Sequence, residues 1–143
     1  MKTVRLGLIG LGNIGQHHYG YLTAGKVNRA ELVAVSDAVP AKLDRYMPLK
    51  AYTDGEELIR SGLVDAVIIA TPHYQHTTLG IAALKQGLHV MVEKPISAHK
   101  ADAERLIANL PGCRVTTLRR FDSFVPSAGK SVAMAATDEN LMA

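Results

Sequence analysis

The chain has 143 residues, which suffices for one domain with a hydrophobic core and not for two. Apolar residues make up 48% and charged residues 20%, as in ordinary soluble proteins, and a net charge of +3 without a basic run gives no reason to expect nucleic-acid binding. The single cysteine, Cys113, excludes an internal disulfide, and no apolar stretch approaches the roughly 20 residues of a membrane span, so we expect a cytoplasmic protein.

Apolar runs alternate with helical stretches along most of the chain. In chain order we expect a strand at 3–10, a helix at 13–25, a strand at 31–37, a short helix at 40–47, a weak strand at 50–53, a helix at 55–62, a strand at 64–72, a helix at 76–87, a strand at 89–95, a helix at 98–110 and a strand at 113–118. Pro40 suits a first helical turn, and Asp54 and Ser97 are candidate N-caps.

The alternation predicts an α/β fold. The strands are too apolar to face water, which indicates parallel strands covered by helices on both faces. Right-handed crossovers leave few topologies, and we choose the doubly wound Rossmann order 3-2-1-4-5-6. From Ser123 the pattern stops, because residues 123–143 are rich in Ala, Ser, Gly and Met and have no sustained period. We therefore expect a nucleotide-binding domain at 1–122 and a poorly ordered tail at 123–143.

Three glycines follow the first expected strand in "LIGLGNIGQHH". In a dinucleotide-binding turn, Gly10 permits the tight turn, Gly12 lets a pyrophosphate approach the backbone, and Gly15 lets the helix lie close to the sheet. Such spacing also occurs in ordinary turns, but its place between a strand and a helix favours the dinucleotide site. Asp37 ends the second strand at about the 20-residue distance expected of the ribose-binding acid.

Asp37 also bears on the choice of cofactor. A carboxylate accepts hydrogen bonds from two ribose hydroxyls and repels a 2′-phosphate, and Ala38 leaves no arginine next to it. Lys42 and Arg45 lie further along the chain and could still reach that phosphate. We therefore predict NAD as the cofactor, with NADP as the alternative.

Two more loops end on the same edge of the expected sheet. Thr71 and Pro72 follow the fourth strand and could pack on the nicotinamide, and "EKP" ends the fifth. Lys94 precedes a proline, which favours an extended conformation, and its ammonium could orient a substrate oxygen or help to move its proton. The alternative for Lys94 is a surface ion pair with Glu93. His73 and His76 lack a ligand cluster, so we expect no metal site.

Together, "GLGNIG", the acid at Asp37, "ATPHYQH" and "VEKP" resemble the glucose–fructose oxidoreductase / inositol dehydrogenase / MocA family. The resemblance runs from about Val4 to Asp122. It implies hydride transfer between NAD(P) and a sugar, cyclitol or related polyol. It also implies which residues act: Lys94 meets the substrate, and the cofactor contacts come from Gly10, Gly12, Asn13, Ile14, Gly15, Asp37, Thr71, Pro72, His76, Glu93, Lys94 and Pro95.

The resemblance does not reach the family's second α/β domain, which we expect this chain to lack. That domain supplies an acid–base aspartate and histidine, much of the substrate wall and usually the oligomer interface. The resemblance therefore implies a truncated chain that binds cofactor and turns over poorly alone. The alternatives are a non-catalytic nucleotide-binding sensor or partner module, or an inactive gene remnant.

Overall fold

The computed structural model describes residues 3–109, 115–117 and 133–134. Within them the elements follow the expected alternation of strands and helices. In chain order they are β1 (Val4–Ile9), α1 (Asn13–Thr23), β2 (Ala30–Ser36), the 3₁₀ helix η1 (Pro40–Tyr46), β3 (Lys50–Tyr52), α2 (Gly55–Arg60), β4 (Ala66–Ile69), the 3₁₀ helix η2 (His73–Gln75), α3 (His76–Lys85), β5 (His89–Val92), α4 (Lys100–Ala108), β6 (Val115–Thr117) and β7 (Ala133–Met134).

The strands form one parallel sheet in the order β3-β2-β1-β4-β5-β6-β7. The predicted Rossmann order 3-2-1-4-5-6 is therefore confirmed. The seventh strand was not predicted: Ala133 and Met134 pair with β6 inside the segment where we expected no regular structure. The other residues of 123–143 lie outside the part of the chain that the structure describes, as do Cys113 and the ends of the last predicted strand.

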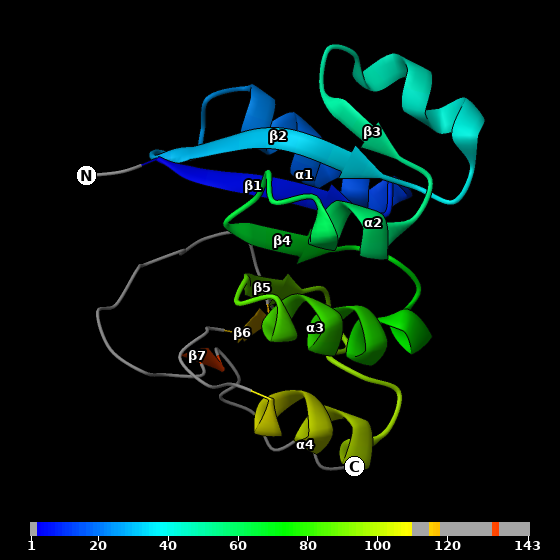
Figure 1. The fold of residues 1–143 in the computed structure, drawn as a ribbon, viewed down its shortest axis with the longest axis vertical. Helices are drawn as coiled ribbons and strands as arrows, with labels where there is room; N and C mark the ends of the chain where they lie inside the picture. Colours follow the sequence, from blue (N-terminus) through cyan, green and yellow to red (C-terminus); the bar gives the residue numbers. More distant parts are fainter. Residues whose placement is uncertain (1–2, 110–114, 118–132, 135–143) are drawn as a thin grey trace.

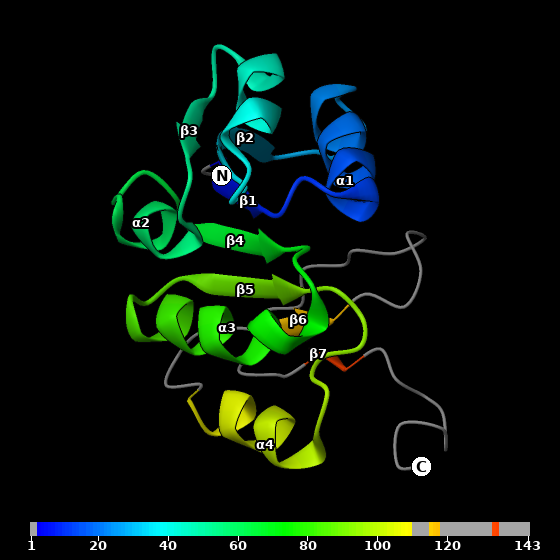
Figure 2. The same cartoon turned by 90° about the vertical axis from the view of Figure 1, so that its right-hand side faces the viewer.

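Helices cover the sheet on both faces, as the apolar strands predict. Figures 1 and 2 show α1 and the cyan helix η1 on one side, and α2, α3 and α4 on the other. Each face has its own core, because successive strand residues point in opposite directions. Leu8 and Ile68 pack with the α1–η1 core, whereas the next residues, Ile9 and Ile69, pack with the α2–α3–α4 core.

Two helix starts show how local sequence meets tertiary structure. The Asp54 cap is confirmed, since its Oδ1 accepts the Glu56 N–H at 2.9 Å. The prediction that Ser97 caps α4 is wrong: the N-cap is His99, and Ser97 Oγ instead accepts from the His99 N–H at 3.3 Å. The buried Ile96, 7% exposed, holds the preceding chain against the core, so the helix begins later than the sequence pattern indicates.

Arg5 and Asp65 join β1 to β4 at the amino-terminal edge of the sheet. The Arg5 guanidinium donates to both Asp65 carboxylate oxygens, at 2.8 and 3.1 Å, and the Arg5 N–H donates to Oδ2 at 2.9 Å. The Asp65 N–H in turn donates to the Arg5 carbonyl at 2.8 Å. This bidentate pair fixes the register of two strands that are distant in sequence.

Candidate functional site

The predicted site loops leave the carboxyl ends of β1, β2, β4 and β5. Sheet hydrogen bonds continue into the first residues of all four loops. These bonds run from the N–H groups of Gly10, Asp37, Ala70 and Glu93 to the carbonyls of Ser36, Tyr52, Ile9 and Ile69, at 2.7–3.2 Å. The loops therefore start from a rigid edge, and this edge is where ligands bind in open α/β sheets.

The three glycines of the first loop differ in what a side chain at each position would meet. Gly10 has φ +94°, and a Cβ there would lie 2.7 Å from the Ala70 carbonyl, so only glycine fits. A Cβ on Gly15 would overlap the Gly10 carbonyl oxygen, which explains how α1 comes so close to the loop. A Cβ on Gly12 would meet no described atom within 4 Å, so open space adjoins the backbone there.

The start of α1 suits an anion. Its N-cap is Gly12, which brings no side-chain cap, and the first turn holds no acidic residue. The first N–H groups of a helix have no partner within the helix, and its dipole favours negative charge at this end. The open space at Gly12 and the uncapped helix therefore fit a pyrophosphate, and the exposed Asn13 and Ile14 flank the same turn.

Asp37 lies beside this loop and is 9% exposed. Its Oδ2 accepts the Leu11 N–H at 2.8 Å and meets Lys42 Nζ at 3.1 Å, while Oδ1 accepts the Val39 N–H at 2.9 Å. Burial alone would raise the pKa of this carboxyl, but the two backbone N–H groups and Lys42 outweigh it and lower the pKa below its ordinary value. Asp37 is thus an ionised acceptor that also shapes the glycine loop.

The loop after β4 carries an unsatisfied polar atom. Among the described residues, Thr71 Oγ1 is buried and has no hydrogen-bond partner. A buried hydroxyl without a partner is uncommon and calls for an explanation, such as a ligand group that it would bind. Thr71 and the exposed Pro72 therefore fit the predicted cofactor contact, on an observation that is independent of the glycines.

His76 begins α3, at the residue where the sequence predicts the start of a helix. The side chain is 1% exposed, with Nδ1 2.9 Å from the Pro95 carbonyl oxygen and Nε2 2.8 Å from that of Thr71. Both ring nitrogens thus face protein backbone. His76 joins the two loops at the nicotinamide end of the predicted site, and a direct contact with cofactor stays a prediction.

Glu93 and Lys94 end β5 and have different surroundings. Glu93 Oε1 lies 2.6 Å from His18 Nε2 of α1, and Oε2 accepts the Lys94 N–H at 3.2 Å. Burial would raise the pKa of Glu93, but the His18 hydrogen bond and charge, with a smaller effect of Lys94, lower it below the ordinary value. Lys94 is exposed, precedes a cis peptide bond to Pro95, and has no hydrogen bond or ion pair on its ammonium among residues 3–109, 115–117 and 133–134.

Sequence reasoning missed His18. It is 4% exposed, and its partner Glu93 lies far away in the chain, so neither residue gives a local signal of the contact. The sequence shows only that His18 lies on the predicted helix that follows the glycine loop.

In the described part of the chain, His, Cys, Asp and Glu side chains form no group of three that could hold a metal ion. None of the described helices has the length and apolar character to cross a membrane.

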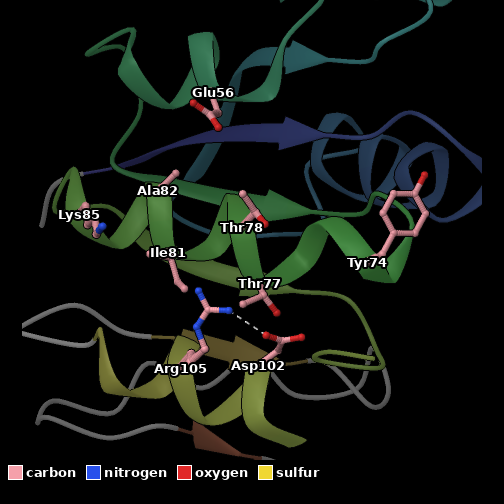
Figure 3. Close-up of a pocket in the computed structure, with 9 residues that line it drawn as sticks. All are labelled: Glu56, Tyr74, Thr77, Thr78, Ile81, Ala82, Lys85, Asp102 and Arg105. Carbon is pink, nitrogen blue, oxygen red and sulfur yellow. Dashed lines mark hydrogen bonds and ion pairs between the residues drawn. The ribbon is translucent and has the colours of Figure 1, made fainter. Parts of the chain in front are cut away.

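A separate hollow of about 330 Å³ lies on the helical face formed by α2, α3 and α4. Figure 3 shows Arg105 and Asp102 of α4, which are paired at 3.0 Å, facing Thr77 and Ile81 of α3. None of the predicted site residues lines this hollow. It is therefore distinct from the loops at the carboxyl edge of the sheet.

Comparisons with known proteins agree with this geometry. A family model described as "Oxidoreductase family, NAD-binding Rossmann fold" matches residues 4–116. Inositol 2-dehydrogenase 1 of Saccharopolyspora erythraea is 37% identical over 131 residues, which cover 84% of this chain and 38% of that protein. Myo-inositol 2-dehydrogenase of Thermotoga maritima is 37% identical over 127 residues, covering 83% and 37%.

Solved structures give the same result. Scyllo-inositol dehydrogenase from Lactobacillus casei, with bound NAD(H) and scyllo-inositol, superposes with a TM-score of 0.74 at 29% identity over 81% of this chain and 36% of that one. The WlbA dehydrogenase from Bordetella pertussis, in complex with NADH and UDP-GlcNAcA, gives 0.76 at 28% identity over 82% and 37%. The chain spans less than half the length of the relatives it matches.

Proposed function

Since the chain belongs to the Gfo/Idh/MocA family of oxidoreductases, with its NAD-binding Rossmann fold, we propose that it binds NAD along the carboxyl edge of its sheet and serves hydride transfer to or from a polyol, cyclitol or sugar. The observation that carries the proposal is the glycine loop. Open space at Gly12 adjoins an uncapped helix start, and the ionised Asp37 lies beside it. The relatives named above, which include inositol dehydrogenases and a structure with NAD(H) bound, support the substrate class.

Each part of the dinucleotide has candidate residues. The pyrophosphate would lie at Gly12 and the first N–H groups of α1, and the adenosine ribose at Asp37. The nicotinamide would lie against Ile14, Thr71 and Pro72, where the Thr71 hydroxyl still lacks a partner among the described residues. When bound, the nicotinamide supplies the hydride acceptor or donor.

Lys94 is the proposed catalytic residue. Glu93 is held by His18, and no described carboxylate pairs with the Lys94 ammonium. The ammonium is therefore available to donate a hydrogen bond to the hydroxyl or carbonyl oxygen of the substrate and so to orient that oxygen for hydride transfer. This arrangement favours the catalytic interpretation of Lys94 over the surface ion pair.

Asp37 and Lys42 give opposing indications about the 2′ position of the ribose. The carboxylate repels a 2′-phosphate, whereas the Lys42 ammonium, 3.1 Å from it, offers that phosphate a counter-charge. Three donors already occupy Asp37, but a carboxylate has about four acceptor positions, so a ribose hydroxyl can still bind. We propose a preference for NAD, which Lys42 reduces without reversing.

Titration of the chain with NADH, followed by nicotinamide fluorescence, tests this function. We expect saturable binding that is lost in Gly12→Val, because the valine side chain would fill the open space at the loop. Gly12 has φ −73°, which valine adopts without strain, so circular dichroism should show the variant folded. Absence of saturable binding by the wild-type chain, or binding that Gly12→Val retains, would reject the proposed site.

A further inference from the structure

Two buried histidines contact the segment that carries Lys94. The segment Glu93–Ser97, here named the Lys94 loop, leaves β5 at the edge of the sheet and leads to α4. His18 of α1 contacts its first residue, and His76 of α3 contacts its middle. We propose that His18 and His76 are positioning residues, which hold the Lys94 loop in a fixed place at the nicotinamide end of the site; this inference rests on the proposed function.

The contact of His18 joins the Lys94 loop to α1, the helix proposed to bind the pyrophosphate. His18 Nε2 and Glu93 Oε1 are 2.6 Å apart, a short contact between side chains that are only 5% and 12% exposed. An ionised carboxylate only accepts hydrogen bonds, so the ring Nε2–H donates. The second carboxylate oxygen accepts the Lys94 N–H, which connects the histidine to the backbone of the lysine itself.

The contacts of His76 join the Lys94 loop to the loop that follows β4. The His76 ring lies between the Thr71 and Pro95 carbonyl oxygens and contacts each through a different nitrogen. One rigid ring thus sets the spacing of two loops, one of which carries the unpartnered Thr71 hydroxyl. Because Pro95 follows Lys94 directly, a shift of its carbonyl would also shift the lysine.

Apolar packing holds the far end of the loop. Ile96 is buried in the core of the α2–α3–α4 face, and the Thr77 hydroxyl donates to Ser97 Oγ at 3.2 Å. Glu93, Pro95 and Ile96 are therefore each anchored to a different helix or core, whereas Lys94 between them is exposed. A fixed backbone under an exposed lysine is what a group that must meet a substrate oxygen requires.

The experiment compares matched variants of the full chain. His18→Leu removes the donor and His18→Gln keeps one, while His17→Leu alters the exposed neighbour on the same helix as a control. For the contacts of His76, the variant is His76→Leu. Its matched control is His73→Leu, which changes an exposed histidine just before α3. Hydrogen exchange by mass spectrometry follows the Lys94 loop in the free protein, and binding is measured for NADH and for ADP-ribose, which lacks the nicotinamide.

We expect His18→Leu and His76→Leu to speed exchange in the Lys94 loop by about tenfold or more, with β1 and β2 unchanged. NADH affinity should fall about tenfold, while ADP-ribose affinity stays within about twofold of wild type. His18→Gln, His17→Leu and His73→Leu should behave as wild type. An equal loss of both ligands, or loop exchange at the wild-type rate in both leucine variants, would overturn the inference.

A second variant covers the case in which His18→Leu folds poorly. In the double variant His18→Leu with Glu93→Met, no buried charge loses its partner, so folding stability should return. We expect its Lys94 loop to exchange fast even so, and wild-type exchange would show that the pair only stabilises the fold. If the wild-type chain binds neither ligand, the proposed function fails, and the exchange measurements alone decide the role of the histidines.

Discussion

Asp37→Ala should affect folding and cofactor choice by separate routes. The Leu11 N–H would lose its acceptor at a fully buried position, which costs about 1–3 kcal/mol. The Val39 N–H and the half-exposed Lys42 add less than about 1 kcal/mol together, since both can turn to water. We therefore expect the free energy of unfolding to fall by about 1–4 kcal/mol.

The effect of Asp37→Ala on binding should depend on the 2′ group. NADH would lose one charge-assisted hydrogen bond, worth about 1.5–3 kcal/mol, whereas NADPH would lose a repulsive carboxylate and keep Lys42. At about 1.4 kcal/mol per factor of ten, the ratio of NADH to NADPH affinity should fall at least about tenfold.

Two assays separate these effects. Urea unfolding followed by circular dichroism measures stability, and fluorescence titrations with NADH and NADPH measure the ratio of affinities. Asp44→Ala is the matched control, because it removes one exposed carboxylate from the neighbouring 3₁₀ helix. An unchanged affinity ratio in Asp37→Ala would refute the ribose role, and unchanged stability would refute the role in the glycine loop.

Three further predictions concern the same edge. Gly10→Ala should lower the free energy of unfolding by about 2–4 kcal/mol, because φ +94° and the nearby Ala70 backbone both oppose a Cβ; thermal unfolding measures this, and a variant as stable as wild type would contradict it. Lys42→Met should weaken NADPH binding about tenfold and change NADH binding by less than about threefold, which titration of both cofactors checks. The pKa of Asp37 is lowered in the folded state, so its contribution to stability is complete above about pH 4 and is lost as the pH falls through the folded pKa. The difference in unfolding free energy between wild type and Asp37→Ala, measured in urea at several pH values, should therefore stay constant from neutral pH to about pH 4 and narrow below it.

Much of the fold follows from local patterns. The apolar runs at β1, β4 and β5 predict buried parallel strands. Successive residues of a strand point to opposite faces of the sheet, and helices cover both faces, so nearly every residue of the run is apolar. The glycine spacing and Asp37 predict the pyrophosphate turn. Each glycine stands where a side chain would prevent the tight turn, the approach of a phosphate or the close packing of the helix, and these positions have a fixed spacing in the sequence. The same residues predict the edge of the sheet at which we propose that NAD binds.

Contacts between distant segments could not be predicted in this way. The His18–Glu93 pair depends on how α1 lies across the sheet, which no local pattern records. Burial of Ile96 moves the start of α4 past Ser97, although Ser97 satisfies the local rule for an N-cap. The strand at Ala133 and Met134 depends on pairing with β6, and two residues carry no periodic signal of their own.

The Arg5–Asp65 pair separates alignment from chemistry. A parallel strand that slips by one residue turns its side chains to the opposite face. Here a slip of β4 against β1 would break four hydrogen bonds between Arg5 and Asp65, which lie at the edge of the sheet opposite the predicted site loops. Substitutions in the exposed loop residues at the carboxyl edge leave those hydrogen bonds intact. Substitutions that change ligand preference at the carboxyl edge can therefore leave the register of β1 and β4 at the amino-terminal edge unchanged.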